Sequence, residues 1–425
     1  MFEWYGEIKA KLPRVAPVRQ KFPKDSIADV AAVVAKEMAK PEIEKELKLG
    51  LRAAILVGSR GIGRLDEIVR ALVNELKQRG VEPFIIPAMG SHGGGIAEKQ
   101  AELLAGYNIT AESMGVPVRA SMEVVSLGEV EPGLPVYVDK ITATEADIII
   151  PVARVKPHTS FRGKVESGLY KMLVIGMGKH KGAQTIHEQG FERFHELIPK
   201  AGEFILERTP VRFGLAIVEN SEDMPAVIEL VPAAEFASRE PELLELSRSL
   251  MARINFTNID VLVIREIGKN ISGGGMDPNI TGRFNLPHIK DGPLMAKKIV
   301  VLDLTEETHG NATGIGLADT TTRRLVEKID FHATYTNLIT STKLDRARVP
   351  VVMEDDYKAI ALAVQTLNRV PDGQARLVII KNTLELENIY VSEALLPEIE
   401  NNPQMEVLGP VQEIPFGPAG ELLLP

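Results

Sequence analysis

The stretch AAILVGSRGIGRLDEIVRALVNELKQRGVEPFIIP, residues 53–87, decides the fold class. Its apolar start, residues 53–57, is typical of a buried strand, and the glycine-rich residues 58–64 form a loop. The pattern over 65–78 then predicts a helix, followed by a second apolar strand over 81–87. A strand, a crossover helix and a parallel strand form a right-handed unit whose ligands bind at the carboxyl ends of the strands.

Similar patterns recur along the rest of the chain. Residues 146–152 indicate another buried strand, and a second α/β series begins at 260–264. We therefore predict an α/β fold of two α/β domains with mainly parallel sheets and an active-site cleft between them. The predicted domains are residues 1–255 and 256–425, with the tail after Pro403 packing back on the first domain.

Composition narrows the class of protein. A chain of 425 residues is too long for one ordinary core, and 44% hydrophobic with 25% charged residues is typical of a soluble globular protein. A net charge of -9 argues against nucleic-acid binding, so a small anion is the expected partner. No secretion signal or membrane span is evident, which favours the cytoplasm. The absence of cysteine restricts protein metal ligands to nitrogen and oxygen, and the oligomeric state stays open.

The first loop carries two arginines, Arg60 and Arg64, just before the predicted helix. Arginine at a helix N-terminus is suited to capturing an anion such as a carboxylate. The glycines Gly58, Gly61 and Gly63 do not match the dinucleotide-binding pattern. A tight strand-to-helix turn with solvated arginines is the structural alternative.

Two histidines follow strand ends at the same predicted edge. His92 lies in the glycine-rich loop 88–95, and His158 follows the strand over 146–152. We expect these two loops to meet. The residues after His158, which include Thr159, Ser160, Arg162 and Lys164, are unusually polar, so this stretch is a candidate for substrate choice.

Lys171 stands in an apolar context, Gly168-Leu169-Tyr170-Lys171-Met172-Leu173. Such a setting can lower the pKa of an amine and make it a nucleophile, although a helix lysine with a solvated amine is the alternative. No serine-nucleophile elbow and no phosphate-binding loop motif occur, and the candidate loops are poor in carboxylates. What remains are histidine bases, a candidate covalent lysine and anion-binding cations.

At Gly90-Ser91-His92, Pro157-His158, Lys171 and His187 the chain resembles the nickel-dependent lactate racemases and related 2-hydroxyacid racemases and epimerases. The resemblance implies a nickel-pincer pyridinium mononucleotide joined through a thioamide to Lys171, with His187 as the nickel ligand. The cofactor brings its own sulfur, which suits a chain without cysteine. Cofactor-synthesis proteins would then be partners.

Two nearby cations, Lys179 and Lys181, are our candidates for contacting the nucleotide phosphate. A solvated basic turn explains them equally well.

The resemblance also implies a mechanism. The α-hydrogen leaves as hydride to the cofactor while a histidine takes the hydroxyl proton, and hydride return to the other face inverts the centre. His92 and His158 are the predicted acid and base. Arg64 or Arg60 would hold the substrate carboxylate, and Lys269 from the second domain would close on it.

The polar stretch after His158 favours a hydroxyacid larger or more anionic than lactate. Two other functions stay open from the sequence. One is a cofactor-free lyase or dehydratase that uses Lys171 as a Schiff base, and the other is a non-catalytic protein that binds a nucleotide or anion.

Overall fold

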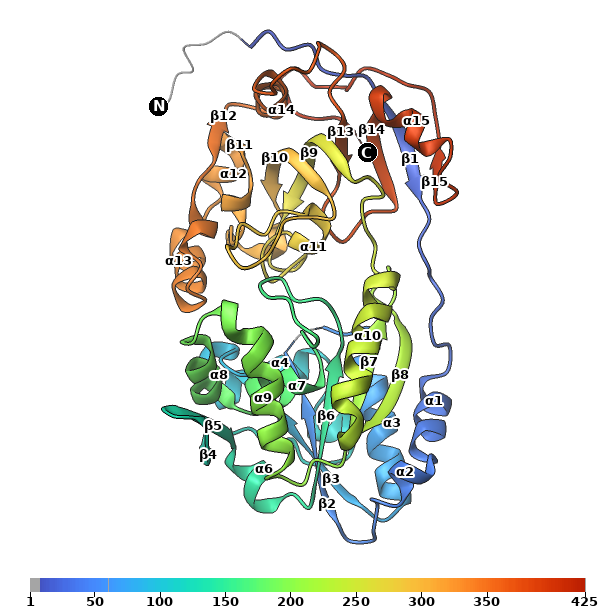
Figure 1. Cartoon of the computed structure of the whole chain (residues 1–425), viewed down its shortest axis with the longest axis vertical. Coiled ribbons are helices and arrows are strands. Elements are labelled where there is room, and N and C mark those ends of the chain that lie inside the picture. The colour runs from blue at the N-terminus through green and yellow to red at the C-terminus, as the bar shows by residue number, and fades with distance from the viewer. Residues whose placement is uncertain (1–7, 60, 425) are drawn as a thin grey trace. The chain divides into compact units, whose positions relative to one another are not determined.

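The computed structural model describes residues 8–59 and 61–424, and these form two compact units. The N-terminal unit is Pro23–Met251, and the C-terminal unit combines the described parts of Met1–Phe22 and Ala252–Pro425. Both are α/β units, and their elements are labelled in Figure 1.

The N-terminal unit is built on a sheet with the strand order β3-β2-β6-β7-β8. Strands β3, β2, β6 and β7 are parallel, and only β8 is antiparallel to its neighbour. The strand after the first crossover is therefore parallel, as the opening stretch predicted. The bounds are β2 Arg52–Val57, β3 Glu82–Pro87, β6 Ile148–Arg154, β7 Phe213–Glu219 and β8 Pro225–Pro232.

Helices cover both faces of this sheet, because alternate residues of each strand are buried in different cores. Along β2, Ala54 and Leu56 belong to one core, whereas Ala53, Ile55 and Val57 belong to the other. The first core contains α7 Leu169–Lys171, α9 Phe194–Leu206 and α10 Phe236–Leu250. The second contains α1 Val30–Met38, α2 Pro41–Glu44, α3 Leu65–Gln78, α4 Ala97–Gly106 and α5 Ala111–Met114.

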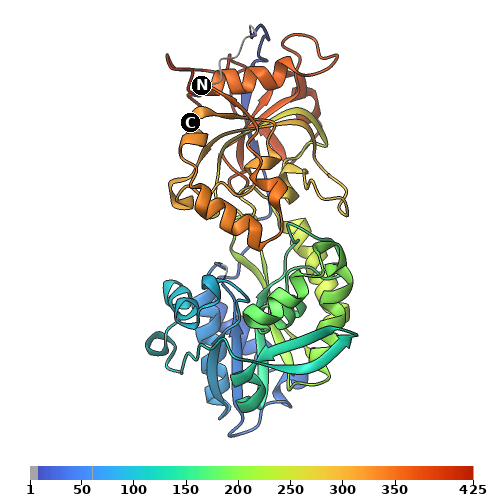
Figure 2. The ribbon, with the colours of Figure 1, turned by 90° about the vertical axis from the view of Figure 1, so that its left-hand side faces the viewer.

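An antiparallel hairpin, β4 Val124–Glu131 and β5 Leu134–Asp139, forms a separate two-stranded sheet. Figure 2 shows it in teal, crossing the surface of the unit. Strand β5 packs against α8 Lys179–His187, and β4 packs against α9. The short helix α6 Lys140–Glu145 follows the hairpin.

The C-terminal unit has a larger sheet with the order β12-β11-β10-β9-β13-β14-β1-β15. The first five strands are parallel and the last three pair antiparallel. The strands are β1 Val15–Gln20, β9 Asn258–Ile267, β10 Met295–Leu304, β11 Thr320–Thr322, β12 Val351–Met353, β13 Leu377–Ile380, β14 Asn388–Ser392 and β15 Met405–Val407. The helices are α11 Pro278–Thr281, α12 Arg323–Glu327, α13 Phe331–Thr340, α14 Asp356–Gln365 and α15 Leu396–Ile399.

The predicted α/β fold class with mainly parallel sheets is confirmed. The division of the chain differs from the prediction at both ends. The N-terminal strand β1 pairs with β14 and β15, so residues predicted in the first domain belong to the C-terminal unit. The tail after Pro403 also packs within the C-terminal unit, where Ile414 and Leu424 join the core around β9 and β13. Both results reflect pairing between distant segments, which local patterns do not encode.

Among the described residues, none of the helices is long and apolar enough to cross a membrane.

Candidate active site

Three loops of the N-terminal unit begin at the carboxyl ends of parallel strands, after β2, β3 and β6. The loop after β2 is held by a buried carboxylate, because Gly63 N donates to Glu219 Oε1 at 2.8 Å. Glu219 also pairs with Arg154, which ends β6. The three loops thus share one edge, as parallel strands require.

His92 lies at the start of the turn Gly93–Gly95, in the loop after β3. Its side chain is exposed, and Nδ1 contacts the Ser59 hydroxyl from the loop after β2. The amide of buried Gln100 holds the loop from below, donating to Gly90 O at 3.0 Å and to His92 O at 2.9 Å. If His92 Nδ1–H donates to Ser59 Oγ, the Nε2 atom carries the lone pair and serves as a base.

The loop of His92 packs closely against the segment that follows Lys171. Gly90 N donates to Gly176 O at 3.2 Å. A Cβ atom on Gly176 would lie 2.7 Å from Ala88 O, so only glycine permits this approach. The predicted acid-base loop and the predicted cofactor segment are therefore in contact through their backbones.

The loop of His158 follows β6 and is closed at its base by backbone hydrogen bonds. Lys156 and Ser167 pair across its base, with Lys156 N donating to Ser167 O at 3.0 Å. Inside the loop, the Glu166 side chain is fully buried and accepts a hydrogen bond of 2.6 Å from His158 N. Burial raises the pKa of Glu166, opposed by the arginines at positions 162 and 248.

The His158 ring has a defined orientation. Ser160 N donates to His158 Nδ1 at 3.1 Å, so the neutral ring carries its proton on Nε2. In this arrangement His158 presents a hydrogen-bond donor. Its ring lies 4.6 Å from that of Phe161 and 6.0 Å from that of Phe191, measured between centroids.

His187 ends helix α8 and reaches the same aromatic cluster. Its ring centroid is 5.5 Å from Phe191 and 5.2 Å from Phe194, both in edge-to-face geometry. In the neutral ring Nδ1–H donates to Ala183 O at 2.6 Å, and the lone pair is then on Nε2. Phe191 thus contacts both predicted histidines, His158 and His187, although they are far apart in sequence.

Lys171 is the last residue of α7 and is half-buried. It leads directly into the π-helical turn Met172–Gly176, a form of helix that is rare and frequent at functional sites. Met172 of this turn approaches Gly58, where an added Cβ would lie 3.0 Å from its terminal carbon. Lys171 therefore lies on the same edge of the sheet as the loop after β2.

Two glutamates, the buried Glu240 and the exposed Glu203, anchor α7. Tyr170 N donates to Glu240 Oε2 at 3.1 Å, and the Tyr170 hydroxyl donates to Glu203. Burial raises the pKa of Glu240 to about 8, because its side chain lies in the core with no exposed surface. A Cβ on Gly168 would lie 2.2 Å from Glu240 Oε1, so glycine is required where this carboxyl meets the helix.

The structure gives Lys179 a different role from the predicted phosphate contact. Its side chain is fully buried, donates to Pro87 O at 2.5 Å and lies 3.3 Å from Asp139 Oδ2. Burial lowers the pKa of Lys179, and the Asp139 charge opposes that shift. Lys179 is therefore a structural ion-pair residue. Lys181 is exposed and lies over the Tyr137 ring, 4.4 Å from its centroid.

The predicted substrate-binding cations are placed differently. Arg64 donates through all its guanidinium nitrogens, to Glu67 and to the carbonyls of Ile27 and Ala28. It fastens the segment before α1 rather than facing a ligand. Arg60 lies outside the described residues. Lys269, in the C-terminal unit, donates from Nζ to Gly273 O at 2.8 Å.

The residues present are suited to the cofactor that the sequence suggests. Among the described residues no three His, Cys, Asp or Glu side chains gather as a metal site. A single histidine donor such as His187 is sufficient where the remaining ligand atoms belong to the cofactor. The oriented ring of His187 can supply that donor, and the half-buried Lys171 can supply the amine that joins the cofactor.

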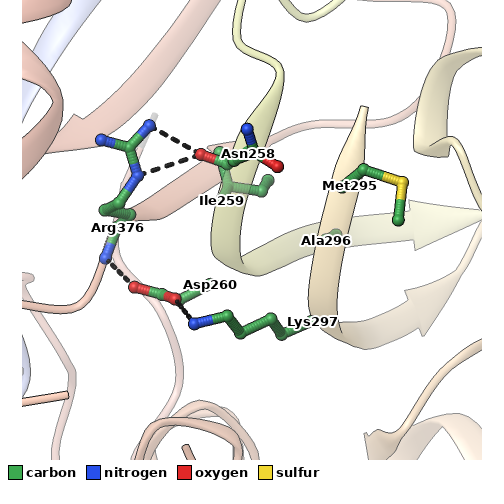
Figure 3. Close-up of a pocket in the computed structure, with 7 residues that line it drawn as sticks. All are labelled: Asn258, Ile259, Asp260, Met295, Ala296, Lys297 and Arg376. Atoms are coloured by element: carbon green, nitrogen blue, oxygen red, sulfur yellow. Dashed lines mark hydrogen bonds and ion pairs between the residues drawn. The ribbon is translucent and has the colours of Figure 1, made fainter. Parts of the chain in front are cut away.

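A shallow cavity of about 340 Å³ occurs in the C-terminal unit, at the amino ends of β9 and β10. Its charged side chains are bonded within the protein, as Figure 3 shows: Lys297 Nζ lies 2.7 Å from Asp260 Oδ1, and the Arg376 guanidinium donates to the backbone carbonyl of Asn258. It lies at the opposite end of the strands from the glycine-rich loops of that unit, so it does not correspond to the predicted site.

Sequence reasoning missed the residues that hold these loops, above all Glu166, Glu240, Gln100 and Phe191. Glu166 had a signal, since it is an acid within a basic stretch. Glu240 and Gln100 lie on helices among other polar residues, and their burial follows only from packing.

The fold is that of an α/β protein, and its histidines and lysine form a candidate ligand site at the carboxyl ends of parallel strands. Residues 9–196 match the lactate racemase N-terminal domain, and this match supports the lactate racemase family for that part of the chain. Among solved structures, the lactate racemase apoprotein from Thermoanaerobacterium thermosaccharolyticum is similar, with a TM-score of 0.50 and 13% identity. The alignment covers 95% of this chain and 94% of that one, which shows a shared fold. No curated protein matches the sequence.

Proposed function

We propose that this protein racemises or epimerises a 2-hydroxycarboxylic acid, using a nickel-pincer nucleotide held by Lys171 and His187. The observation that supports the proposal is the aromatic cluster at Phe191, whose ring contacts both His158 and His187. A predicted acid-base residue and a predicted metal ligand therefore pack against the same aromatic side chain. The match of residues 9–196 to the lactate racemase N-terminal domain supports the same chemistry.

Lys171 would anchor the cofactor covalently, and His187 would donate its Nε2 lone pair to the nickel. The hydrogen bond from His187 Nδ1 to Ala183 O keeps the ring in the tautomer that such a ligand needs. When bound, the cofactor supplies an electrophilic carbon that accepts hydride. The chain's own residues then have to bind the substrate and move the hydroxyl proton.

The two histidines are suited to different parts of that proton transfer. His92, bonded to Ser59 through Nδ1, can accept a proton at Nε2. His158 presents Nε2–H in its neutral form and donates a hydrogen bond to a substrate oxygen. In the reverse direction His158 has to accept a proton at Nε2, so its ring must give up the hydrogen bond from Ser160 N to Nδ1. The two directions of the reaction therefore place different demands on His158.

Substrate choice would depend on the polar loop after His158. Arg162 donates to Glu166 and to the His158 carbonyl, so part of its hydrogen-bonding capacity is used within the loop. Lys164 is exposed on the same loop. An exposed cation here favours a hydroxyacid with a second anionic or polar group. Arg60 and Lys269 stay candidates for the α-carboxylate, and Lys181 for the phosphate.

The proposal is tested by intact mass after expression with cofactor-synthesis proteins and nickel. The wild-type chain should gain the mass of the nickel nucleotide, and Lys171→Ala should lose both the adduct and racemisation, by at least about 10³-fold, because the electrophile is no longer held. Lys200→Ala is the matched control, since it removes an exposed lysine of the same unit that pairs with Glu131, and it should keep the adduct.

Other results would decide against the proposal. An unmodified chain that still turns over a hydroxyacid would favour the cofactor-free lyase or dehydratase. An unmodified and inactive chain that binds nucleotides would favour a binding protein.

A further inference from the structure

We propose that Glu166 is the positioning residue of His158: its buried carboxylate fixes the loop so that the His158 ring is held in one orientation at the site. This inference rests on the proposed function for its catalytic meaning. The positioning itself follows from contacts within the N-terminal unit.

Glu166 joins both ends of the loop segment that carries His158. Its Oε2 accepts from His158 N at 2.6 Å, and its Oε1 faces Gly163 N at 3.4 Å. Between these points Phe161 is buried in the core, 1% exposed. The backbone on either side of the His158 side chain is therefore anchored, and Ser160 N is placed to donate to His158 Nδ1.

Two arginines complete the arrangement. Arg162 Nη1 donates to Glu166 Oε2 at 3.2 Å and to His158 O at 2.5 Å. Arg248 Nη2, from helix α10, donates to Glu166 Oε1 at 2.6 Å. Every partner of this carboxylate is a donor, and two are cations, which offsets the cost of burying its charge. Arg248 thereby ties the loop to a long helix of the core.

A neutral amide cannot replace this carboxylate. Glutamine offers one acceptor oxygen, and its NH₂ group would face either Arg248 or the His158 amide, both of which are donors. Glu166→Gln should therefore release one side of the loop while preserving side-chain volume. The result is a loss of His158 orientation without a large cavity.

The test uses the ¹⁵N imidazole signals of histidine in the full-length protein without cofactor. The His158 signals are assigned by their absence in His158→Gln. In Glu166→Gln they should move toward the values of an exposed ring that exchanges between its two tautomers. The signals of the exposed His180 and His332 should not move. Arg248→Met, which removes only the outer anchor, should shift the His158 signals in the same direction by a smaller amount.

Glu145→Gln is the matched control, because Glu145 also binds an arginine through both oxygens, at 2.6 and 2.7 Å to Arg119, but outside this loop. It should leave the His158 signals unchanged. In loaded enzyme, Glu166→Gln should lower kcat about 10- to 100-fold with a smaller change in KM, since the substrate still binds but the donor is misplaced.

Unchanged His158 signals in folded Glu166→Gln and Arg248→Met would overturn the positioning role. The NMR result does not depend on catalysis, so the two proposals fail separately. Shifted His158 signals in a protein that never binds the cofactor would uphold the positioning of His158 and reject the proposed function.

Discussion

The two histidine loops of the N-terminal unit are held in different ways. The side that carries His158 and Lys171 depends on buried carboxylates, with Glu166 inside the loop and Glu240 at the start of α7. The loop of His92 is held by the neutral amide of Gln100 and by backbone bonds. A buried carboxyl changes its charge with pH, whereas an amide does not. The anchors of His158 and Lys171 should therefore respond to pH, and the Gln100 anchor of the His92 loop should not.

The largest expected effect concerns the two histidines themselves. His92→Ala and His158→Ala should each reduce racemisation by about 10²- to 10⁴-fold, because each removes a proton-transfer or hydrogen-bonding group. The measurement is the steady-state rate in both directions, with intact mass to show that the Lys171 adduct is retained. If the two sides of the site differ as their hydrogen bonds suggest, the two variants should affect the forward and reverse rates unequally. Full activity in both would end the two-histidine mechanism.

The next effect is on stability and concerns Glu240. Its pKa is raised by burial from 4.5 to about 8, so between these values the folded state holds a proton that the unfolded state has released. This contribution is fully present below pH 4.5 and is lost as pH rises toward 8. In the wild type, this group should lower the free energy of unfolding by about 3–4 kcal/mol between pH 5 and 8. The Glu240→Gln variant should not show that decrease.

Urea unfolding of wild type and Glu240→Gln at several pH values measures that difference directly. Parallel pH profiles for the two proteins would show that the pKa of Glu240 is not raised in the folded state. The Glu145→Gln variant, which changes a half-buried glutamate paired with Arg119, should give a profile parallel to wild type between pH 5 and 8.

The smallest effect is expected on the other side of the comparison. Gln100→Met deletes the two amide hydrogen bonds to Gly90 O and His92 O at nearly constant volume. We expect a loss of about 1–2 kcal/mol, because two buried carbonyl groups lose a donor. Urea unfolding should show the same loss at pH 5 and pH 8. A strongly pH-dependent loss would remove the distinction between the two loops.

Much of this arrangement could be predicted from the sequence. The alternation of apolar and glycine-rich segments is local, so the strand over 53–57 and the helix over 65–78 were placed closely. Parallel strands then put the loops of His92 and His158 at one edge.

The cations were harder to assign, because a lysine or arginine looks the same in a sequence whether it binds a ligand or a carboxylate. Arg64 and Lys179 both lie in glycine-rich, basic stretches that suggested anion binding. In the fold they meet Glu67 and Asp139, respectively, and these contacts engage them within the protein. Lys179 is separated from Asp139 along the chain, so no local pattern could show the pair.

The sequence by itself determined the α/β class, the two-unit organisation in outline and the residue types at the ligand edge, because periodicity and glycine placement are properties of neighbouring residues. Only the tertiary structure decided which cations are paired with carboxylates of the protein itself. It also decided that β1 belongs to the C-terminal unit. It also decided that Phe191 joins His158 to His187 and that Glu166 and Glu240 lie buried beside the site. These features depend on contacts between distant segments, because a side chain is buried, and its pKa shifted, only when those segments pack together.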